Sequence, residues 1–152
     1  MYLFIVAALM FVLPIGSVAL QSIQSDAPAM SLLMLKWFVI WSVGARLFLA
    51  GVRQIVQPRY TAEVILQLKH AESLMLVREL GFANLAIGSA GLASAFMPAW
   101  SPAVALAGGI FYGLAGANHL RQSHRGKLEN IAMVSDLFVG AILLVCLAMS
   151  LV

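Results

Sequence analysis

Hydrophobic residues fill five long stretches of this chain, and short polar segments separate them. A helix needs about 20 apolar residues to cross the hydrocarbon of a membrane, because each residue advances the helix by about 1.5 Å. All five stretches reach that length, so the pattern predicts an all-α, polytopic bundle that forms a single transmembrane domain over residues 1–152. The expected spans are residues 1–23, 30–56, 74–97, 103–122 and 130–152.

The first stretch has an alternative interpretation as a secretory signal peptide that is cleaved near Ser17-Val18-Ala19. A signal peptide begins with basic residues before its apolar region. No Lys or Arg precedes this apolar region. We therefore interpret residues 1–23 as a transmembrane span that is retained.

The loops predict an orientation. Basic residues gather in or beside the second and fourth loops, at Arg53, Arg59, Lys69, Arg121, Arg125 and Lys127. The first and third loops contain neither Lys nor Arg. Because cytoplasmic loops are enriched in Lys and Arg, and because five spans place both basic loops on one side, we expect a cytoplasmic N-terminus and an external C-terminus. The expected location is the inner (cytoplasmic) membrane of a bacterium.

Residues 60–73, between the second and third stretches, are too polar to cross a membrane. One helical face would carry Val64, Ile65, Leu68 and Ala71, and another would carry Glu63, Gln67 and His70. This pattern is typical of a short amphipathic helix that lies on the cytoplasmic surface. A cytoplasmic extension of the third helix would produce the same pattern, and both interpretations remain open.

Composition agrees with a membrane protein, since 62% of the residues are hydrophobic and 10% are charged. In globular proteins about 45–50% of the residues are apolar and about 25% are charged. The net charge is +3, but the basic residues lie at the ends of apolar stretches and form no stripe with aromatics, so no nucleic-acid partner is expected. The single cysteine, Cys146, allows no internal disulfide and is interpreted as a packing residue.

Ionisable residues inside the stretches carry the most informative chemistry. Arg46, Arg78, Glu79 and Asp136 all fall within expected spans, where an unpaired charge is costly. Counting residues from the cytoplasmic ends brings the Arg46 guanidinium to the level of Glu79 and Asp136. The four charges balance, which favours a buried salt-bridge network that fixes the helix register. The alternative is a cytoplasm-facing pocket for a polar headgroup or a proton.

Further polar and small residues complete the candidate set. The intramembrane polar cluster is expected to comprise Arg46, Arg78, Glu79, Asn84, Asn118, His119 and Asp136. Glycines at helical spacing are expected to let neighbouring helices approach closely, at Gly81, Gly88, Gly91, Gly109 and Gly113. The histidines do not share a helical face with other ligands, so no metal site is expected.

Motifs of known chemistry are missing from the sequence. It contains no phosphate-binding glycine loop, no HExxH or CxxC motif, no serine nucleophile elbow and no dinucleotide fingerprint. We therefore assign no catalytic residue, expect no intrinsic catalysis, and find no cofactor implied by a motif.

The second to fifth stretches resemble the DoxX-like superfamily of small bacterial membrane proteins. The residues that carry the resemblance are Arg46-Leu-Phe-Leu-Ala-Gly51, Pro58 and Glu79-Leu-Gly-Phe-Ala-Asn-Leu-Ala-Ile-Gly88. The additional first span and Asp136 depart from the family pattern. The resemblance implies a four-helix core, an accessory role beside thiol- or quinone-linked oxidoreductases, and a structural or pocket pair at Arg46 and Glu79.

These observations predict an accessory or scaffold subunit of a membrane complex, or a protein that binds a small amphiphile. The alternative is a proton-linked carrier or a quinone-interacting redox component that uses Glu79 and Asp136 as proton sites. The expected partners are the lipid bilayer, other membrane subunits, a second copy of the chain, or a lipid or quinone.

Overall fold

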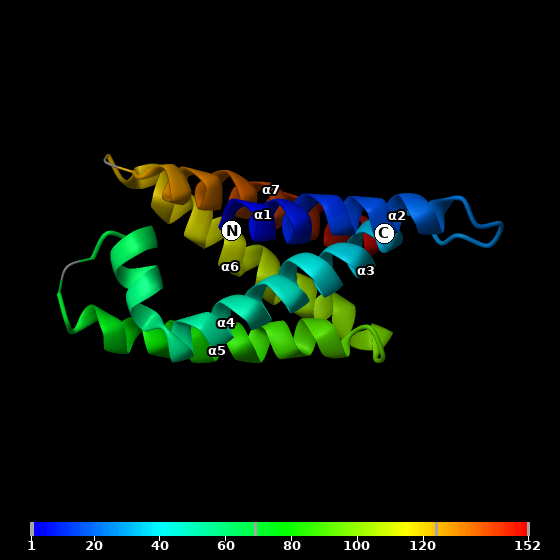
Figure 1. Cartoon of the computed structure of the whole chain (residues 1–152). Coiled ribbons are helices and arrows are strands. Elements are labelled where there is room, and N and C mark those ends of the chain that lie inside the picture. Colours follow the sequence, from blue (N-terminus) through cyan, green and yellow to red (C-terminus); the bar gives the residue numbers. More distant parts are fainter. Residues whose placement is uncertain (1, 69, 124, 152) are drawn as a thin grey trace.

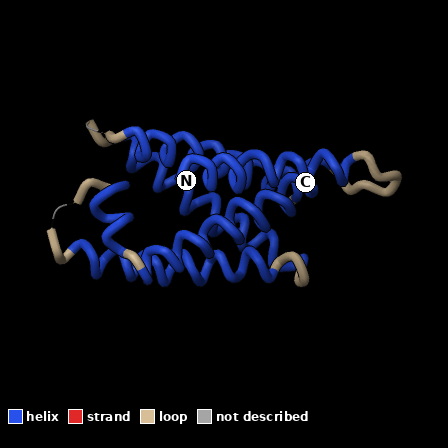
Figure 2. Tube along the Cα trace, in the orientation of Figure 1, coloured by secondary structure: helices blue, strands red, loops and turns tan. Residues whose placement is uncertain are grey.

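A computed structural model describes residues 2–68, 70–123 and 125–151, so Met1, Lys69, His124 and Val152 lie outside the described residues. All regular structure in these ranges is helical (Figure 2). Four helical lengths are long and apolar enough to cross a membrane: Tyr2–Ser22, Met30–Val56, Pro98–Arg121 and Lys127–Ser150.

Each of these lengths is an α-helix or a series of joined helical segments. The first consists of α1 (Tyr2–Ala7), the π-helix η1 (Ala8–Val12) and α2 (Leu13–Ser22). The second consists of α3 (Met30–Phe38), the π-helix η2 (Val39–Ala45) and α4 (Arg46–Val56). The third consists of the short 3₁₀ turn η4 (Pro98–Trp100) and α6 (Ser101–Arg121), and the fourth is α7 (Lys127–Ser150).

The fifth long helix is α5 (Ser73–Ala93), which has 21 residues. It forms where the third stretch was expected to be helical, but it is not among the four lengths that meet the criteria for a membrane span. Arg78, Glu79 and Asn84 lower its apolar content. In Figure 1 it runs beside α4 in the opposite direction.

The helices form two close pairs, α4 with α5 and α6 with α7. Figure 1 shows the pairs meeting near the α5–α6 connection and diverging toward the opposite end, with the first helical length lying along α7. The short π-helix η3 (Tyr60–Ile65) lies between the diverging ends. This divergence leaves space inside the molecule, and the candidate site lies there.

Glycines bring the paired helices into backbone contact. A Cβ added to Gly88 would lie 2.3 Å from the Phe48 nitrogen, and one added to Gly91 would lie 2.6 Å from the Gly44 Cα. Neither position has room for a side chain, so α5 packs directly on the backbone of η2 and α4. Of the other glycines expected at helix contacts, Gly81 faces Gln54 and Gly109 faces Leu144. The backbone of Gly113 lies against Gly140, but a Cβ added to Gly113 itself would meet no described atom within 4 Å.

Two π-helical segments join the first three helical lengths through side-chain hydrogen bonds. The Ser42 hydroxyl in η2 donates to the Leu9 carbonyl in η1 over 3.2 Å, and the Tyr112 hydroxyl of α6 donates to the Ser42 carbonyl over 2.5 Å. Ser42 and Tyr112 are buried at 0% and 2% exposure. These bonds hold the inner end of the site in place, because Tyr112 also lines the cavity described below.

Residues 60–65 form a separate short helix, η3, and residues 66–68 and 70–72 are not helical, so α5 does not extend back into this segment. Helical winding begins at Pro58 and ends with η3, and α5 starts at Ser73. Val64 of the expected apolar face is 51% exposed and free to contact lipid, whereas Ala62 is fully buried, so the surface-lying amphipathic segment stays a prediction. Thr61 and Ala62 are buried, and the larger side chains of Tyr60 and Ile65 line the space between the helix pairs.

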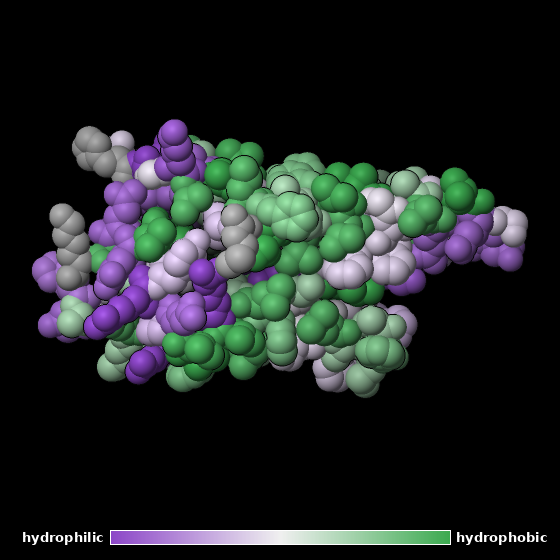
Figure 3. All heavy atoms as spheres, in the orientation of Figure 1, coloured by the Kyte–Doolittle hydropathy of each residue, from purple (hydrophilic) through white to green (hydrophobic). Residues whose placement is uncertain are grey.

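The outer surface is largely apolar between two polar ends (Figure 3). Large apolar side chains on different helices are exposed there, such as Phe4 at 76%, Leu20 at 70% and Leu114 at 68%. A soluble protein rarely exposes so much contiguous apolar surface. Together with the four apolar helical lengths, this surface is that of a membrane protein.

Candidate functional site

A cavity of about 180 Å³ lies between the diverging helix pairs. This volume is smaller than the roughly 300–1,000 Å³ of pockets that bury a drug-sized ligand. Residues from α1, α4, η3, α5, α6 and α7 line it. Its polar lining consists of Tyr2, Arg46, Arg53, Gln54, Tyr60, Thr61, Asn84, Tyr112, His119 and Asp136.

Helical periodicity in α4 brings two arginines to the cavity. Residues three, four and seven apart lie on one side of an α-helix. Arg46, Ala50 and Arg53 follow this spacing, and all three line the cavity. The same face includes the half-exposed Leu49, which borders the cavity near the outer apolar surface.

Both arginines lie over aromatic rings but retain unsatisfied donors. The Arg46 Cζ lies 5.9 Å from the centroid of the Tyr2 ring, and the Arg53 Cζ lies 3.6 Å from that of Tyr60. The Nε atoms of Arg46 and Arg53 are buried and have no hydrogen-bond partner among the described residues. A buried donor without an acceptor is costly, so the described chain does not satisfy either guanidinium group completely, although both arginines line the cavity.

A buried amide pair between α4 and α5 forms another part of the cavity wall. Asn84 Nδ2 of α5 donates to Gln54 Oε1 of α4 over 2.8 Å, and the two residues are 3% and 8% exposed. The Asn84 Oδ1 atom is also buried and accepts no hydrogen bond from any part of the chain that the structure describes. This oxygen adds one free acceptor to the two free donors.

Asp136 contributes the negative charge of the cavity. It lies on the inward face of α7 with 7% exposure. Within residues 2–68, 70–123 and 125–151, its carboxylate forms neither an ion pair nor a hydrogen bond. It lines the same cavity as Arg46 without pairing with it directly.

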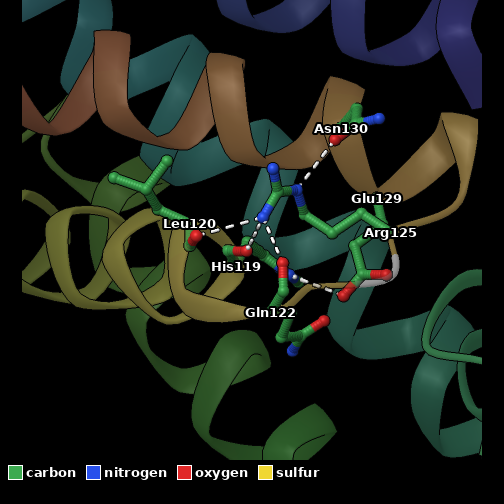
Figure 4. Close-up of polar contacts among 6 residues, drawn as sticks. All are labelled: His119, Leu120, Gln122, Arg125, Glu129 and Asn130. Carbon is green, nitrogen blue, oxygen red and sulfur yellow. Dashed lines mark hydrogen bonds and ion pairs between the residues drawn. The ribbon is translucent and has the colours of Figure 1, made fainter.

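The corner between α6 and α7 fixes the position of His119. His119 Nδ1 and Glu129 Oε1 are 3.0 Å apart, and Glu129 is only 3% exposed (Figure 4). Arg125 Nη1 donates to the carbonyls of His119 and Leu120 over 3.0 Å each, and also to the Gln122 carbonyl. The last carbonyls of a helix lack intrahelical partners, so Arg125 caps α6 and holds the corner closed.

The structure brings together four of the seven residues expected in the polar cluster. Arg46, Asn84, His119 and Asp136 line the cavity. The other three, Arg78, Glu79 and Asn118, are exposed and do not line it.

The expected network of Arg46, Glu79 and Asp136 is therefore wrong, because Glu79 lies outside the cavity that the other two residues line. The face of α5 that contacts α4 carries Val77, Gly81 and Asn84. Arg78 and Glu79 follow Val77 by about 100° and about 200° around the helix, which turns both outward. Among the described residues the one side-chain ion pair is that of His119 with Glu129, so the arrangement is a polar pocket rather than a closed network.

Sequence reasoning did not identify several residues of the site. Arg53 was expected in a basic loop, and Gln54 and Tyr60 were not expected in the polar cluster, although all three line the cavity. The seven-residue separation of Arg46 and Arg53 was the available signal, because it places both on one helical face. The position of Tyr60 depends on the fold of η3, and no local pattern reveals it.

The cavity combines a slight excess of positive charge with an apolar wall. Two arginines and one aspartate line it, a difference of one positive charge, while His119 is paired with Glu129. The apolar side chains around it include Ile5, Leu47, Leu49, Leu80 and Phe111. No group of three or more His, Cys, Asp or Glu residues suited to a metal ion occurs in the described ranges.

Comparison with protein families gives one match. The model of a family of unknown function (DUF6790) matches residues 1–151, so the chain belongs to this family. None of the curated proteins and none of the solved structures matches the chain. The family match does not bear on the DoxX-like resemblance, which stays a prediction.

Proposed function

We propose that this DUF6790 protein binds a small amphiphile, with the polar headgroup in the cavity and the apolar chain against its hydrophobic wall. The observation that carries the proposal is the set of buried, unsatisfied polar atoms around one cavity: the Nε atoms of Arg46 and Arg53 and the Oδ1 atom of Asn84. Binding sites for small molecules are mostly apolar with a few convergent polar groups, and this cavity has that character.

The membrane setting is part of the proposal. We propose five spans, with α5 as the third, a cytoplasmic N-terminus and an external C-terminus in a bacterial inner membrane. The antiparallel course of α5 beside α4 supports the fifth span. The basic loops around Arg59 and Arg125 lie at the same end of the bundle, which supports the orientation.

The other expected roles fit the site less well. A proton path through Glu79 and Asp136 requires both carboxylates to face one space, but Glu79 is exposed outside the cavity. The pair implied by the DoxX-like resemblance, Arg46 with Glu79, is separated for the same reason. We therefore favour amphiphile binding over proton-linked transport, and an accessory role in a larger assembly is compatible with it.

Photocrosslinking in lipid vesicles tests the proposed function. Two single-chain probes of equal length, a diazirine-bearing hexadecanol and a diazirine-bearing palmitate, are added to the reconstituted full chain, and crosslinked peptides are mapped by mass spectrometry. At least one probe should label residues that line the cavity. Ala115→Leu should abolish that labelling, because Ala115 lines the cavity and a larger side chain would fill it.

Ala141→Leu is the matched control, because Ala141 is exposed on α7 and does not line the cavity. This variant should label like the wild-type chain. If both probes label only the outer surface, or if Ala115→Leu leaves cavity labelling unchanged, the proposed function is wrong.

A further inference from the structure

We infer that the bound amphiphile carries a single negative charge on a compact headgroup, as a single-chain carboxylate does. This inference rests on the proposed function and specifies the class of ligand. Its basis is the position of two arginines in one small, largely apolar cavity with one carboxylate to offset them.

The charges around the cavity favour an anion with one charge. Arg46 and Arg53 contribute two positive charges, and Asp136 offsets one of them. A neutral headgroup would leave the remaining positive charge uncompensated in an apolar setting. A headgroup with two negative charges would instead leave one uncompensated negative charge. A guanidinium binds a carboxylate through short, charge-assisted hydrogen bonds, and both Nε donors are without partners in the described chain.

The acidic side chain of the cavity limits where the anion sits. Asp136 lines the cavity from α7 and repels a negative group, whereas Arg53 and Tyr60 line it from α4 and η3, so the headgroup is assigned to Arg53. The remaining space beside Asn84 suits a hydrogen-bond donor such as a water molecule.

The dimensions of the cavity favour one chain over a complete phospholipid. The cavity of about 180 Å³ is smaller than the roughly 300–1,000 Å³ of pockets that bury a drug-sized ligand, which suits a compact headgroup and the first carbons of one chain. Leu49 borders the cavity and is 50% exposed, so the rest of the chain can leave the cavity past Leu49 and lie against the outer apolar surface.

The test compares the acid and alcohol probes at equal chain length. Palmitate should half-saturate cavity labelling at a concentration about tenfold below that of hexadecanol, because one charge-assisted hydrogen bond accounts for at least that difference. Arg53→Gln should remove the preference for the acid. Arg53→Lys should retain most of it, which separates loss of charge from loss of folding.

Arg78→Gln is the matched control, because it removes the same charge from an exposed position outside the cavity. It should leave the preference for the acid unchanged. Equal labelling of the cavity by acid and alcohol would overturn the anionic ligand while the proposed function stands. If neither probe labels the cavity, both the anionic ligand and the proposed function are wrong.

Two competitors distinguish other sources of the negative charge. Acetate should displace palmitate only at concentrations at least about a hundredfold higher, because it lacks the buried chain. Displacement by acetate at similar concentrations would identify a site for small free anions and contradict the inference. Stronger competition by phosphatidylglycerol vesicles than by palmitate would contradict the single-chain ligand.

Discussion

Asn84 of α5 and Gln54 of α4 form a buried side-chain hydrogen bond of 2.8 Å at the wall of the cavity. This bond joins the two helices where they begin to separate from α6 and α7. Asn84 Oδ1 has no hydrogen-bond donor as a partner among the described residues. Asn84 thus joins α5 to α4 and also lines the cavity.

Asn84→Leu should lower the free energy of unfolding by about 0.5–2 kcal/mol, the range of polar interactions between helices in membranes. The substitution removes the bond and leaves the Gln54 amide unpaired. Thermal unfolding in mild detergent measures the change. Asn118→Leu is the control, since Asn118 is exposed on α6, and it should unfold within about 0.5 kcal/mol of the wild type.

Gly88→Ala should destabilise the protein by about 1–3 kcal/mol, because the added methyl forces α5 away from the backbone of α4. The new Cβ would lie 2.3 Å from the Phe48 nitrogen. Gly113→Ala is a matched substitution on α6, where an added Cβ meets no described atom within 4 Å. It should be neutral or stabilise by up to about 1 kcal/mol, as Ala favours a helix over Gly. Equal melting temperatures for the two variants would contradict the close contact.

His119 and Glu129 should be energetically coupled across the α6–α7 corner. A double-mutant cycle of His119→Asn and Glu129→Gln should give an interaction energy of about 0.5–3 kcal/mol. The parallel cycle of His119→Asn with Glu79→Gln should be additive within about 0.5 kcal/mol, because Glu79 lies outside the site. Denaturant unfolding measures both cycles, and additivity in the first would show that the 3.0 Å contact contributes nothing.

Tyr60→Leu should loosen η3 from α4, because it removes the ring beneath Arg53. Such a contact contributes about 1 kcal/mol, so amide hydrogen exchange in residues 61–66 should accelerate about fivefold. Tyr60→Phe keeps the ring and should exchange like the wild type. Faster exchange in both variants would assign the effect to the hydroxyl group instead.

Single cysteines should reveal whether α5 crosses the membrane. In a Cys146→Ala background, the exposed positions Ser25, Gln67, Ala95 and Ser123 sample the four loops and the end of α5. A membrane-impermeant maleimide added outside should label Ser25→Cys and Ala95→Cys. Gln67→Cys and Ser123→Cys should react only after the membrane is permeabilised. Labelling of Ala95→Cys together with Gln67→Cys would contradict the fifth span.

Hydrophobic pattern predicted the helices well, because each one needs only local information. The ends of the second stretch, residues 30–56, coincide with Met30–Val56, where Pro28 and Pro58 limit the helix on either side. The third stretch ends earlier than expected, at Ala93, because the chain turns before Pro98 rather than at it.

The site was predicted less completely, because the rotation of each helix about its axis decides which residues line the cavity. Depth along a helix is readable from residue counts, and it correctly grouped Arg46 with Asp136. Rotation is decided by packing: the glycines of α5 face α4, which turns Glu79 away. Arg53 shared the face of Arg46, but its position near a helix end indicated a loop charge.

No side chains separate α5 from the backbone at Gly44 and Phe48. This contact limits the size of the molecule that can enter the cavity. An interface made of side chains can adopt new rotamers when a larger guest arrives, whereas two backbones in contact have no rotamers to change. The distance between these two helices therefore cannot adjust to the size of a bound molecule. Selectivity for the width of a guest would be encoded in glycines that never touch it.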